Sequence, residues 1–325
     1  MRAAYYSRNG EARDVMVVGD LPQPVPGPGE VLVRLHTSGV NPSDVKSRRA
    51  RPLNDQHIVP HSDGAGVIEV VGEGVSSARM GERVWIWNGQ WARPLGTASE
   101  YIALPSAQAV TLPEGTDFAA GACLGIPALT AVQAVRLAGD LKGKTVLVTG
   151  ASSAVGHYIT QLVTLAGGHV IGTVGSESKA AHARAAGMKD AIFYKTESVA
   201  DRVKALTAGR GVSVIIDMDF ASTAGLVTAG ALAAHGTVVC YGSNAPEVTI
   251  NFRAMLFGSI AVKFFLVYDL TPEDRAWGLA HLTQLMKAGQ LQHSIGPRFP
   301  LAQIVKAHET VEGGQALGNV VVDLI

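Results

Sequence analysis

The chain has 325 residues, which is long for a single domain and predicts two. Apolar residues make up 47% of it and charged residues 17%, and the formal net charge is zero, so nucleic acid is not expected as a partner. The sequence has neither a charged-then-apolar leader nor a long uninterrupted apolar run, so no signal peptide and no membrane span are expected. The two cysteines, Cys123 and Cys240, lie in apolar segments, and free buried thiols indicate a reducing cytoplasm.

The chain up to about residue 123 is predicted to be mainly β. Its candidate strands are rich in Val and Ile and are bounded by Gly and Pro: "VLVRLHTSGV" (31–40), "AGVIEVVGEG" (65–74) and "GERVWIW" (81–87). The densest basic run, "KSRRAR" (46–51), is predicted to be a solvated turn or helix end rather than a phosphate-binding patch.

From about residue 145 onward, short strands alternate with helices. A strand at 145–150 is followed by a helix from Val155 to Ala166, where apolar residues recur with nearly the α-helical period. Further candidate strands lie at 169–175, 191–195, 212–219 and 236–242. These strands are continuous apolar runs, as expected when helices cover both faces of a parallel sheet. The sequence therefore predicts an α/β domain with a doubly wound parallel sheet.

The turn between the first strand and its helix, "GASSAVG" (150–156), consists almost entirely of small residues. Small residues let a pyrophosphate approach the backbone N–H groups at a helix N-terminus, so the turn indicates a dinucleotide site. The fingerprint is imperfect because Ser153 stands where a glycine is usual. An ordinary strand-to-helix turn is the alternative.

The end of the next strand suggests which dinucleotide binds. Many NAD-binding chains place an acidic residue at this position, whereas this chain has Gly175 and Ser176 there, with Lys179 following. A hydroxyl and a cation suit the additional phosphate of NADP, although Glu177 lies between them. Alternatively, Ser176 only caps the following helix and Lys179 is solvated.

Several motifs in this order and spacing resemble the zinc-independent quinone oxidoreductases of the zeta-crystallin type, within the medium-chain dehydrogenase/reductase superfamily. The resemblance covers nearly the whole chain. It rests on "GVNPSDVKSR" (39–48), "VPHSDGAGVIEVVGEGV" (59–75), "GERVW" (81–85), "ASEY" (98–101), "GIPALTA" (125–131), "VLVTGASSAVG" (146–156), "HVIGTVGSESKAAHARAAG" (169–187), "FPLAQIVKAHETVEGG" (299–314) and "GNVVVDL" (318–324).

The resemblance implies an α/β fold in which a Rossmann domain accompanies a mainly β, partly open GroES-like barrel. The barrel would comprise residues 1–123 and the Rossmann domain residues 124–262, with 263–325 returning to the barrel. NADPH would bind in the cleft between them. The residues implied at the cofactor are Thr130, Ser153, Ala154, Val155, Ser176, Lys179, Tyr194, Tyr241, Gly242, Ser243, Phe265, Leu266 and Asn319.

The resemblance also implies that no metal is bound. Asn41 and Ser62 occupy the places where zinc-dependent relatives have a Cys and a His ligand, and two cysteines are too few for a structural zinc lobe. His61 stands where the zinc-free branch usually has glycine. It is interpreted as a hydrogen-bonded loop histidine, with a position at the mouth of the site as the alternative.

Without a metal, a neutral donor must stabilise the charge that develops on the substrate oxygen. We expect Asn41 to be that donor, and Asp44 to orient its amide or join a water relay. Alternatively, Asn41 only holds the turn before Pro42. Lys46, which replaces a tyrosine common in the family, is expected to point to solvent. Trp85, Trp87 and Trp91 are interpreted as core and loop anchors, or else as an aromatic wall for a flat substrate.

The predicted function is therefore NADPH-dependent reduction of quinones, or of the C=C bond of enones and enals, by hydride transfer. One alternative is reduction of enoyl thioesters on the same fold. The other is a non-enzymatic cofactor-binding protein with a structural or nucleic-acid-binding role. Because "SIAVKFFLV" (259–267) would form an apolar edge strand, a homodimer is also expected.

Overall fold

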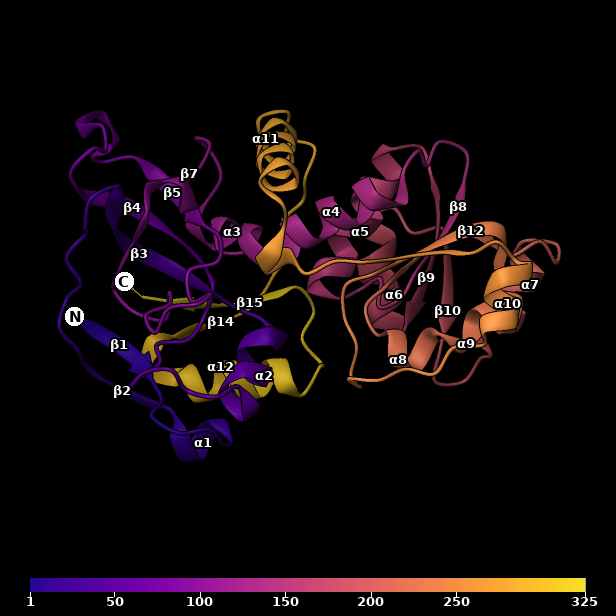
Figure 1. Cartoon of the computed structure of the whole chain (residues 1–325), viewed down its shortest axis with the longest axis horizontal. Coiled ribbons are helices and arrows are strands. Elements are labelled where there is room, and N and C mark those ends of the chain that lie inside the picture. Colours follow the sequence, from indigo (N-terminus) through magenta and orange to yellow (C-terminus); the bar gives the residue numbers. More distant parts are fainter. Residues whose placement is uncertain (325) are drawn as a thin grey trace. The chain divides into compact units, whose positions relative to one another are not determined.

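The computed structural model describes residues 1–324, and the chain divides into two compact units (Figure 1). Unit 1 contains residues 1–127 and 286–288 and the chain from His293 onward, and unit 2 contains 128–285 and 289–292. We expected the chain to return to the first domain at residue 263. The structure places the return at 286, because residues 261–285 are bonded to the rest of unit 2.

Unit 1 is built on a seven-stranded, mainly antiparallel sheet, in the order β14-β15-β3-β4-β5-β7 with β6 also paired to β3. The strands are β3 (Glu30–Val40), β4 (Asp63–Val71), β5 (Arg83–Ile86), β6 (Tyr101–Pro105), β7 (Ala109–Thr111), β14 (Ile295–Pro300) and β15 (Asn319–Asp323). A separate antiparallel pair joins β1 (Arg2–Tyr5) to β2 (Val17–Asp20). The predicted strands at 31–40, 65–74 and 81–87 correspond to β3, β4 and β5.

Short helices connect the strands of unit 1. They are α1 (Ala12–Val15), α2 (Pro42–Ala50), α3 (Phe118–Gly121) and α12 (Ile304–Glu312), with single turns η1 (Ser77–Arg79), η2 (Ser106–Gln108) and η5 (Leu301–Gln303). A π-helical segment, η3 (Leu124–Ala128), stands at the transition to unit 2. The helix α12 packs against α2, so an element from the end of the chain lies beside one that follows β3.

Unit 2 is a parallel six-stranded sheet in the order β10-β9-β8-β11-β12-β13. The strands are β8 (Thr145–Val148), β9 (His169–Val174), β10 (Asp190–Phe193), β11 (Val212–Asp217), β12 (Leu232–Cys240) and β13 (Ala261–Phe264). Numbered within the sheet, this order is 3-2-1-4-5-6, the doubly wound order of dinucleotide-binding folds. The predicted Rossmann sheet is therefore confirmed.

The helices of unit 2 connect these strands. They are α4 (Leu129–Ala138), α5 (Ala154–Leu165), α6 (Glu177–Ala185), α7 (Val199–Leu206), α8 (Phe220–Thr223), α9 (Gly225–Thr228), α10 (Phe252–Phe257) and α11 (Pro272–Lys287), with a turn η4 (Val267–Asp269). The long helix α11 is joined to α4 by an ion pair of 3.0 Å between Arg136 and Asp274, and Gln133 also donates to Asp274 at 2.9 Å. These bonds keep residues beyond β13 in unit 2.

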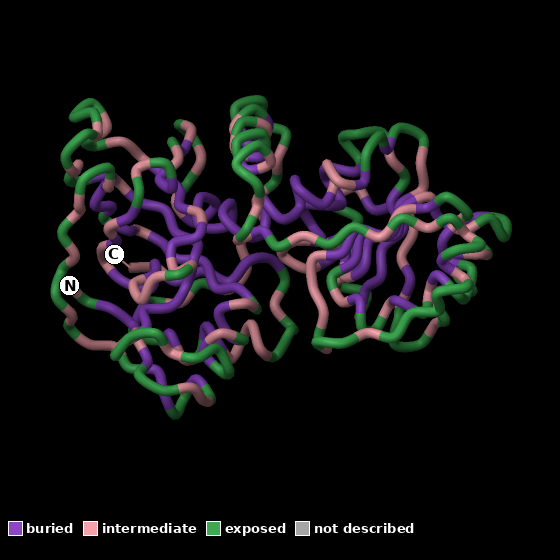
Figure 2. Tube along the Cα trace, viewed as in Figure 1, coloured by how far each residue is buried: buried purple, intermediate pink, exposed green. Residues whose placement is uncertain are grey.

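Each unit has its own apolar core, which follows its sheet (Figure 2). In unit 2, Val146, Leu147 and Val148 of β8 are all fully buried, as expected for a strand covered on both faces. In unit 1 the core between the strands includes Val31, Val33 and Leu35 of β3, whereas Arg34 between them is exposed. Within residues 1–324, no helix has the length and hydropathy that crossing a bilayer would require.

Candidate functional site

Asn41 lies at the junction of β3 and α2. Its backbone is extended, with φ −113° and ψ 157°, and it is the N-cap of α2. Pro42 follows at the first helical position, where its fixed φ suits the helix and its missing N–H costs nothing. The carboxylate of Asp44 accepts the backbone N–H of Asn41 at 2.7 Å. The local sequence therefore fixes the position of Asn41 through a capping arrangement.

The side-chain amide of Asn41 is held by a second carboxylate. Its Nδ2 donates to Oδ2 of Asp63 at 2.7 Å, and Asp63 begins β4 opposite Gly39 of β3. Both side chains are buried. Asp44 was expected to orient this amide; the structure has Asp63 bonding the amide nitrogen, whereas Asp44 accepts the backbone N–H of Asn41 and also interacts with its side chain. The sequence analysis missed Asp63, although it belongs to the His61-Ser62-Asp63 triplet.

Burial shifts the acidity of both carboxylates. It raises the pKa of Asp44 to about 7, although hydrogen bonds from Asn41 act in the opposite direction. Burial also raises the pKa of Asp63 well above its usual range, and the charge of Asp44 adds to that effect. A carboxyl with a pKa near neutrality can hold or release a proton under physiological conditions, which is a common property of functional sites.

His61 lies in the loop before β4 and is fully buried. Its Nδ1 is 2.8 Å from the hydroxyl of Ser38, and its Nε2 is 2.9 Å from Nε2 of His308 in α12. Burial lowers the pKa of His61 to about 3. The interpretation as a hydrogen-bonded loop histidine is confirmed, and a fully buried ring does not line the mouth of a site.

The basic run at 46–51 forms the C-terminal part of α2 and its C-cap. Lys46 and Arg51 are exposed as expected, but the side chain of Arg48 is completely buried and forms an ion pair with Glu312 of α12. The expectation that this run is solvated is therefore wrong for Arg48. Arg48 lies four residues after Asp44, on the helix face that α2 buries.

The three tryptophans have different environments. Trp85 is fully buried in the core. The indole of Trp87 donates to the carbonyl of Ala107 at 3.2 Å, which anchors a loop. Trp91 lines a cavity of unit 1 together with Arg51.

In unit 2, the small-residue turn forms the start of α5. Gly150 has φ 63°, and a side chain at Gly156 would collide with the carbonyl oxygen of Gly150. Ser153 is the N-cap, and its hydroxyl accepts the backbone N–H of Gly156 at 3.0 Å. Ala154 and Val155 open the helix, so the turn presents backbone N–H groups at the N-terminus of a three-turn helix, as a pyrophosphate requires.

The end of β9 carries the groups expected near a 2′-phosphate. Ser176 caps α6 and accepts the backbone N–H of Lys179 at 3.4 Å, so the capping interpretation of Ser176 holds. A side-chain carbon at Gly175 would lie 3.3 Å from the hydroxyl of Tyr194 and 3.5 Å from Cε of Lys195. Lys195 is therefore a second cation at this position. The sequence analysis missed it, although it follows Tyr194 just beyond the end of the neighbouring strand β10.

Five of the expected cofactor residues line one cavity of about 700 Å³ in unit 2. They are Tyr241, Gly242, Ser243, Phe265 and Leu266. Burial raises the pKa of the Tyr241 hydroxyl, and the proximity of Ser153 acts against this rise.

The remaining expected residues lie elsewhere. Thr130 is buried in α4 of unit 2. Asn319 belongs to unit 1 with Asn41 and Asp44, and its Nδ2 donates to the carbonyl of Ser294 at 2.9 Å.

Comparisons with known proteins agree with this architecture. The family model described as "Alcohol dehydrogenase GroES-like domain" matches residues 27–114, and the model described as "Zinc-binding dehydrogenase" matches 154–284. A quinone oxidoreductase of Sus scrofa is 32% identical over 300 residues, covering 90% of this chain and 88% of that protein. The chain belongs to the quinone oxidoreductase family of the medium-chain dehydrogenases/reductases.

Two further relatives illustrate the range of this family. A 2-haloacrylate reductase of a Burkholderia species is 30% identical over 311 residues, covering 91% of each chain. A mycobacterial protein solved in complex with NADPH is 27% identical, with a TM-score of 0.89 over 100% of both chains. Family membership confirms the resemblance and the expected GroES-like and Rossmann architecture.

The sequence analysis expected Asn41 and Ser62 at the places of two zinc ligands. In the structure Asn41 binds Asp63 through its amide, and Ser62 is buried beside His61. Within residues 1–324, no three His, Cys, Asp or Glu side chains are grouped so that they could hold a metal ion.

Proposed function

We propose that this protein reduces quinones, or the C=C bond of α,β-unsaturated carbonyl compounds, with NADPH and without zinc. Support comes from the relatives, which include quinone oxidoreductases and a 2-haloacrylate reductase, and from the mycobacterial structure that contains NADPH. The two buried free cysteines suit a reducing cytoplasm.

The residues of unit 2 fit the cofactor. The N–H groups at the start of α5 would hold the pyrophosphate, and Ser176, Lys179 and Lys195 would hold the 2′-phosphate through charge-assisted hydrogen bonds. NADPH supplies a hydride when it is bound. We therefore expect NADPH to bind more tightly than NADH.

The observation that carries the proposal is the fixed amide of Asn41. One of its two N–H groups donates to Asp63, and the side chain also interacts with Asp44, so two carboxyl groups fix the plane of the amide and the direction of its second N–H. Because the residue is only 5% exposed, water competes little for this second N–H. A neutral donor held in advance in a dry site stabilises the oxygen that becomes negative during reduction.

Asp44 would hold a proton close to this donor. Because burial raises its pKa to about 7, its carboxyl can take up or release a proton near neutral pH. Water can then protonate the carbon of the product, and Asp44 can take part in the proton relay that supplies this water. The proposal thus assigns Asn41 to charge stabilisation, Asp63 to orientation and Asp44 to proton supply.

The test measures NADPH and NADH oxidation by the wild type and by Asn41→Ala with a panel of quinones, enones, enals and enoyl thioesters. Losing a preorganised donor costs about 2.7–4 kcal/mol in the transition state, so kcat with enones should fall roughly 100- to 1000-fold. The effect with the more electrophilic quinones should be smaller, and NADPH affinity should remain.

The matched control is Asn251→Ala. Asn251 is also a helix N-cap, with its Oδ1 accepting the backbone N–H of Ala254 at 3.0 Å, but it lies in unit 2 at the start of α10. The Asn251→Ala variant should keep the kcat of the wild type. If Asn41→Ala reduces enones with the kcat of the wild type, Asn41 only holds the turn before Pro42. If no compound of the panel supports NADPH oxidation, the proposal that this protein is an enzyme is wrong.

A further inference from the structure

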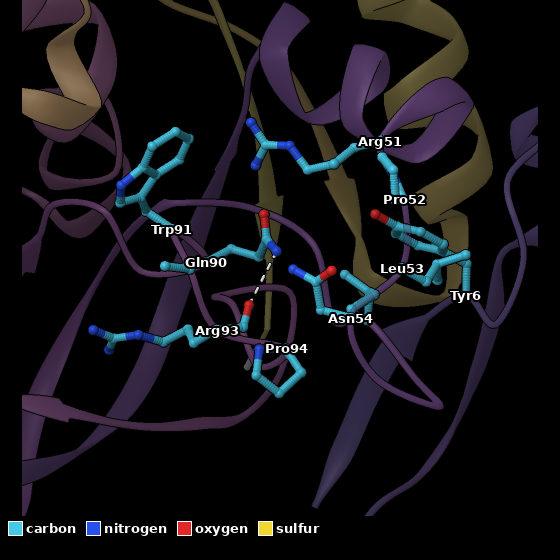
Figure 3. A pocket seen from close by; sticks show the side chains of 11 residues that line it. Tyr6, Arg51, Pro52, Leu53, Asn54, Gln90, Trp91, Arg93 and Pro94 are labelled. Atoms are coloured by element: carbon cyan, nitrogen blue, oxygen red, sulfur yellow. Dashed lines mark hydrogen bonds between the residues drawn. The ribbon is translucent and has the colours of Figure 1, made fainter.

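A cavity of about 480 Å³ in unit 1 has no role in the function proposed above (Figure 3). It lies between residues 51–54, which follow α2, and residues 90–94, which precede β6. Tyr6 and Ile58, which form a β-bridge, complete its wall. Its volume falls within the range of sites for small organic ligands.

The charged residues that line this cavity are both arginines, and no carboxylate lines it. The guanidinium of Arg51 lies 4.9 Å from the ring centroid of Trp91. Arg93 donates through Nη2 to the neutral amide oxygen of Gln108 at 2.5 Å. Within residues 1–324, neither arginine forms an ion pair; burial lowers the pKa of Arg93, and the charge of Glu30 acts against this effect. The cavity is therefore lined by two guanidinium groups that form no ion pair within the described residues.

The remaining polar groups suit an anion. Burial and the charge of Asp44 raise the pKa of Tyr6 to about 12, so its hydroxyl remains protonated and can donate. Gln90 is held by a hydrogen bond of 3.0 Å from its Nε2 to the carbonyl of Arg93, drawn in Figure 3. Trp91 adds a flat apolar surface. Guanidinium groups beside an aromatic face favour a carboxylate or phosphate attached to an apolar body.

The cavity is electrostatically coupled to the candidate catalytic residues. The charge of Arg51 acts against the rise that burial causes in the pKa of Asp44, and the charge of Asp44 adds to the rise in the pKa of Tyr6. Asn41 caps the N-terminus of α2 and Arg51 its C-terminus. A nine-residue helix is about 13 Å long, so an anion at Arg51 would lie roughly one nanometre from the reacting group.

We propose that this cavity binds the anionic end of the substrate, so that the preferred substrate is an unsaturated carbonyl compound with a carboxylate or phosphate at its far end. The proposal rests on the proposed function, because it assigns a substrate class to the same enzyme. The cavity selects for the anion, and Asn41 acts on the conjugated carbonyl.

The test compares an enone that carries a terminal carboxylate on a hexamethylene chain with the methyl ester of the same compound. The acid should have a KM about tenfold lower than the ester, with similar kcat, since a charge-assisted hydrogen bond to arginine is lost in the ester. Arg51→Gln should remove this preference by raising KM for the acid alone, and Arg93→Gln should reduce it. A second pair, an enoyl-coenzyme A against the corresponding enoyl-pantetheine, tests a phosphate as the anionic end.

Arg34→Gln is the matched control, because Arg34 is exposed on β3, pairs with Glu69 and does not line the cavity. It should leave every KM unchanged. Binding of the acid can also be followed without turnover, by quenching of tryptophan fluorescence that Trp91→Phe should abolish. Equal KM values within both pairs, with normal reduction of the ester, would overturn the anion site and leave the proposed function intact. Quenching by the acid without any NADPH oxidation would support the site and remove the proposed function.

Discussion

At the scale of single residues, His61 has an unusual backbone. It has φ 78°, a left-handed conformation that costs a non-glycine residue about 1 kcal/mol or more. Its ring nevertheless bonds Ser38 and His308, and its burial keeps it neutral in the folded protein. The hydrogen bonds of the ring thus compensate for a backbone that glycine would adopt without strain.

This neutral ring should make the protein sensitive to acid. The folded-state pKa of His61 is lowered to about 3 from its ordinary value of 6.5, so its contribution to stability is complete above pH 6.5 and is lost progressively as the pH falls toward 3. We expect His61→Gly to reduce the pH dependence of the unfolding free energy in this window by up to about 1.4 kcal/mol per pH unit. Urea unfolding between pH 4 and pH 7 measures it.

The control for this experiment is His235→Gly. His235 has a similar backbone, with φ 60°, but is exposed. Its replacement should relieve the same kind of strain and leave the pH dependence unchanged. An unaltered pH slope in His61→Gly would show that the buried histidine is not the source of acid sensitivity.

The residues found by sequence reasoning and those missed differ in a physical way. Asn41 and Ser153 stand in local motifs. In each, the end of a strand and the start of a helix fix the backbone conformation independently of distant contacts. Asp63 and Lys195 act through neighbouring strands, β4 beside β3 and β10 beside β9, so their contacts depend on strand pairing. The sequence marks them as polar residues at strand ends but does not specify their partners.

At the scale of elements, α2 and α12 are joined by a buried charge pair. The side chain of Arg48 is 0% exposed and that of Glu312 is 13% exposed. Removing one member of such a pair leaves the other charge buried and uncompensated. We expect Glu312→Ala to lower the free energy of unfolding by about 3–5 kcal/mol, as measured by urea unfolding at pH 7.

The same helix provides the control. Glu309 pairs with Arg13 at 2.8 Å, but that arginine side chain is 73% exposed, so Glu309→Ala should cost less than about 1 kcal/mol. The double variant Arg48→Met, Glu312→Leu should recover most of the loss, because two apolar side chains can replace a buried ion pair. Equal small losses in both glutamate variants would contradict a buried, uncompensated charge.

The sequence predicted the boundaries of helices and strands better than it predicted the contacts between them. The helix expected from Val155 to Ala166 is α5, Ala154–Leu165, because its periodicity and its small-residue turn are both local. The burial of Arg48 was missed because it depends on α12, some 260 residues later. We predicted the return of the chain to unit 1 too early, because the bonds between α4 and α11 join residues that are distant in the sequence and leave no pattern in the local sequence.

At the scale of the whole molecule, unit 2 ends in the edge strand β13. Within the described chain β13 pairs only with β12, so its other edge is unpaired. Phe264 is 64% exposed, and Phe252, Leu256 and Phe257 of α10 are exposed as well. Lys263, the charged residue of the strand, donates to the carbonyl of Leu137 at 2.8 Å and so does not shield the edge. An unpaired apolar edge of this kind favours pairing with another strand.

We therefore expect a homodimer in which β13 pairs with its copy across a two-fold axis. Light scattering at micromolar concentration should give about twice the chain mass of 33.9 kDa. Val262→Pro removes a backbone donor from the edge strand, and Phe264→Lys replaces an exposed apolar residue of that strand with a charge, so both should shift the mass toward the monomer. Leu165→Lys, at an exposed apolar position at the end of α5, should leave the dimer intact. A wild-type mass of one chain would contradict pairing through β13, and a dimer that survives both edge substitutions would assign its interface to another surface.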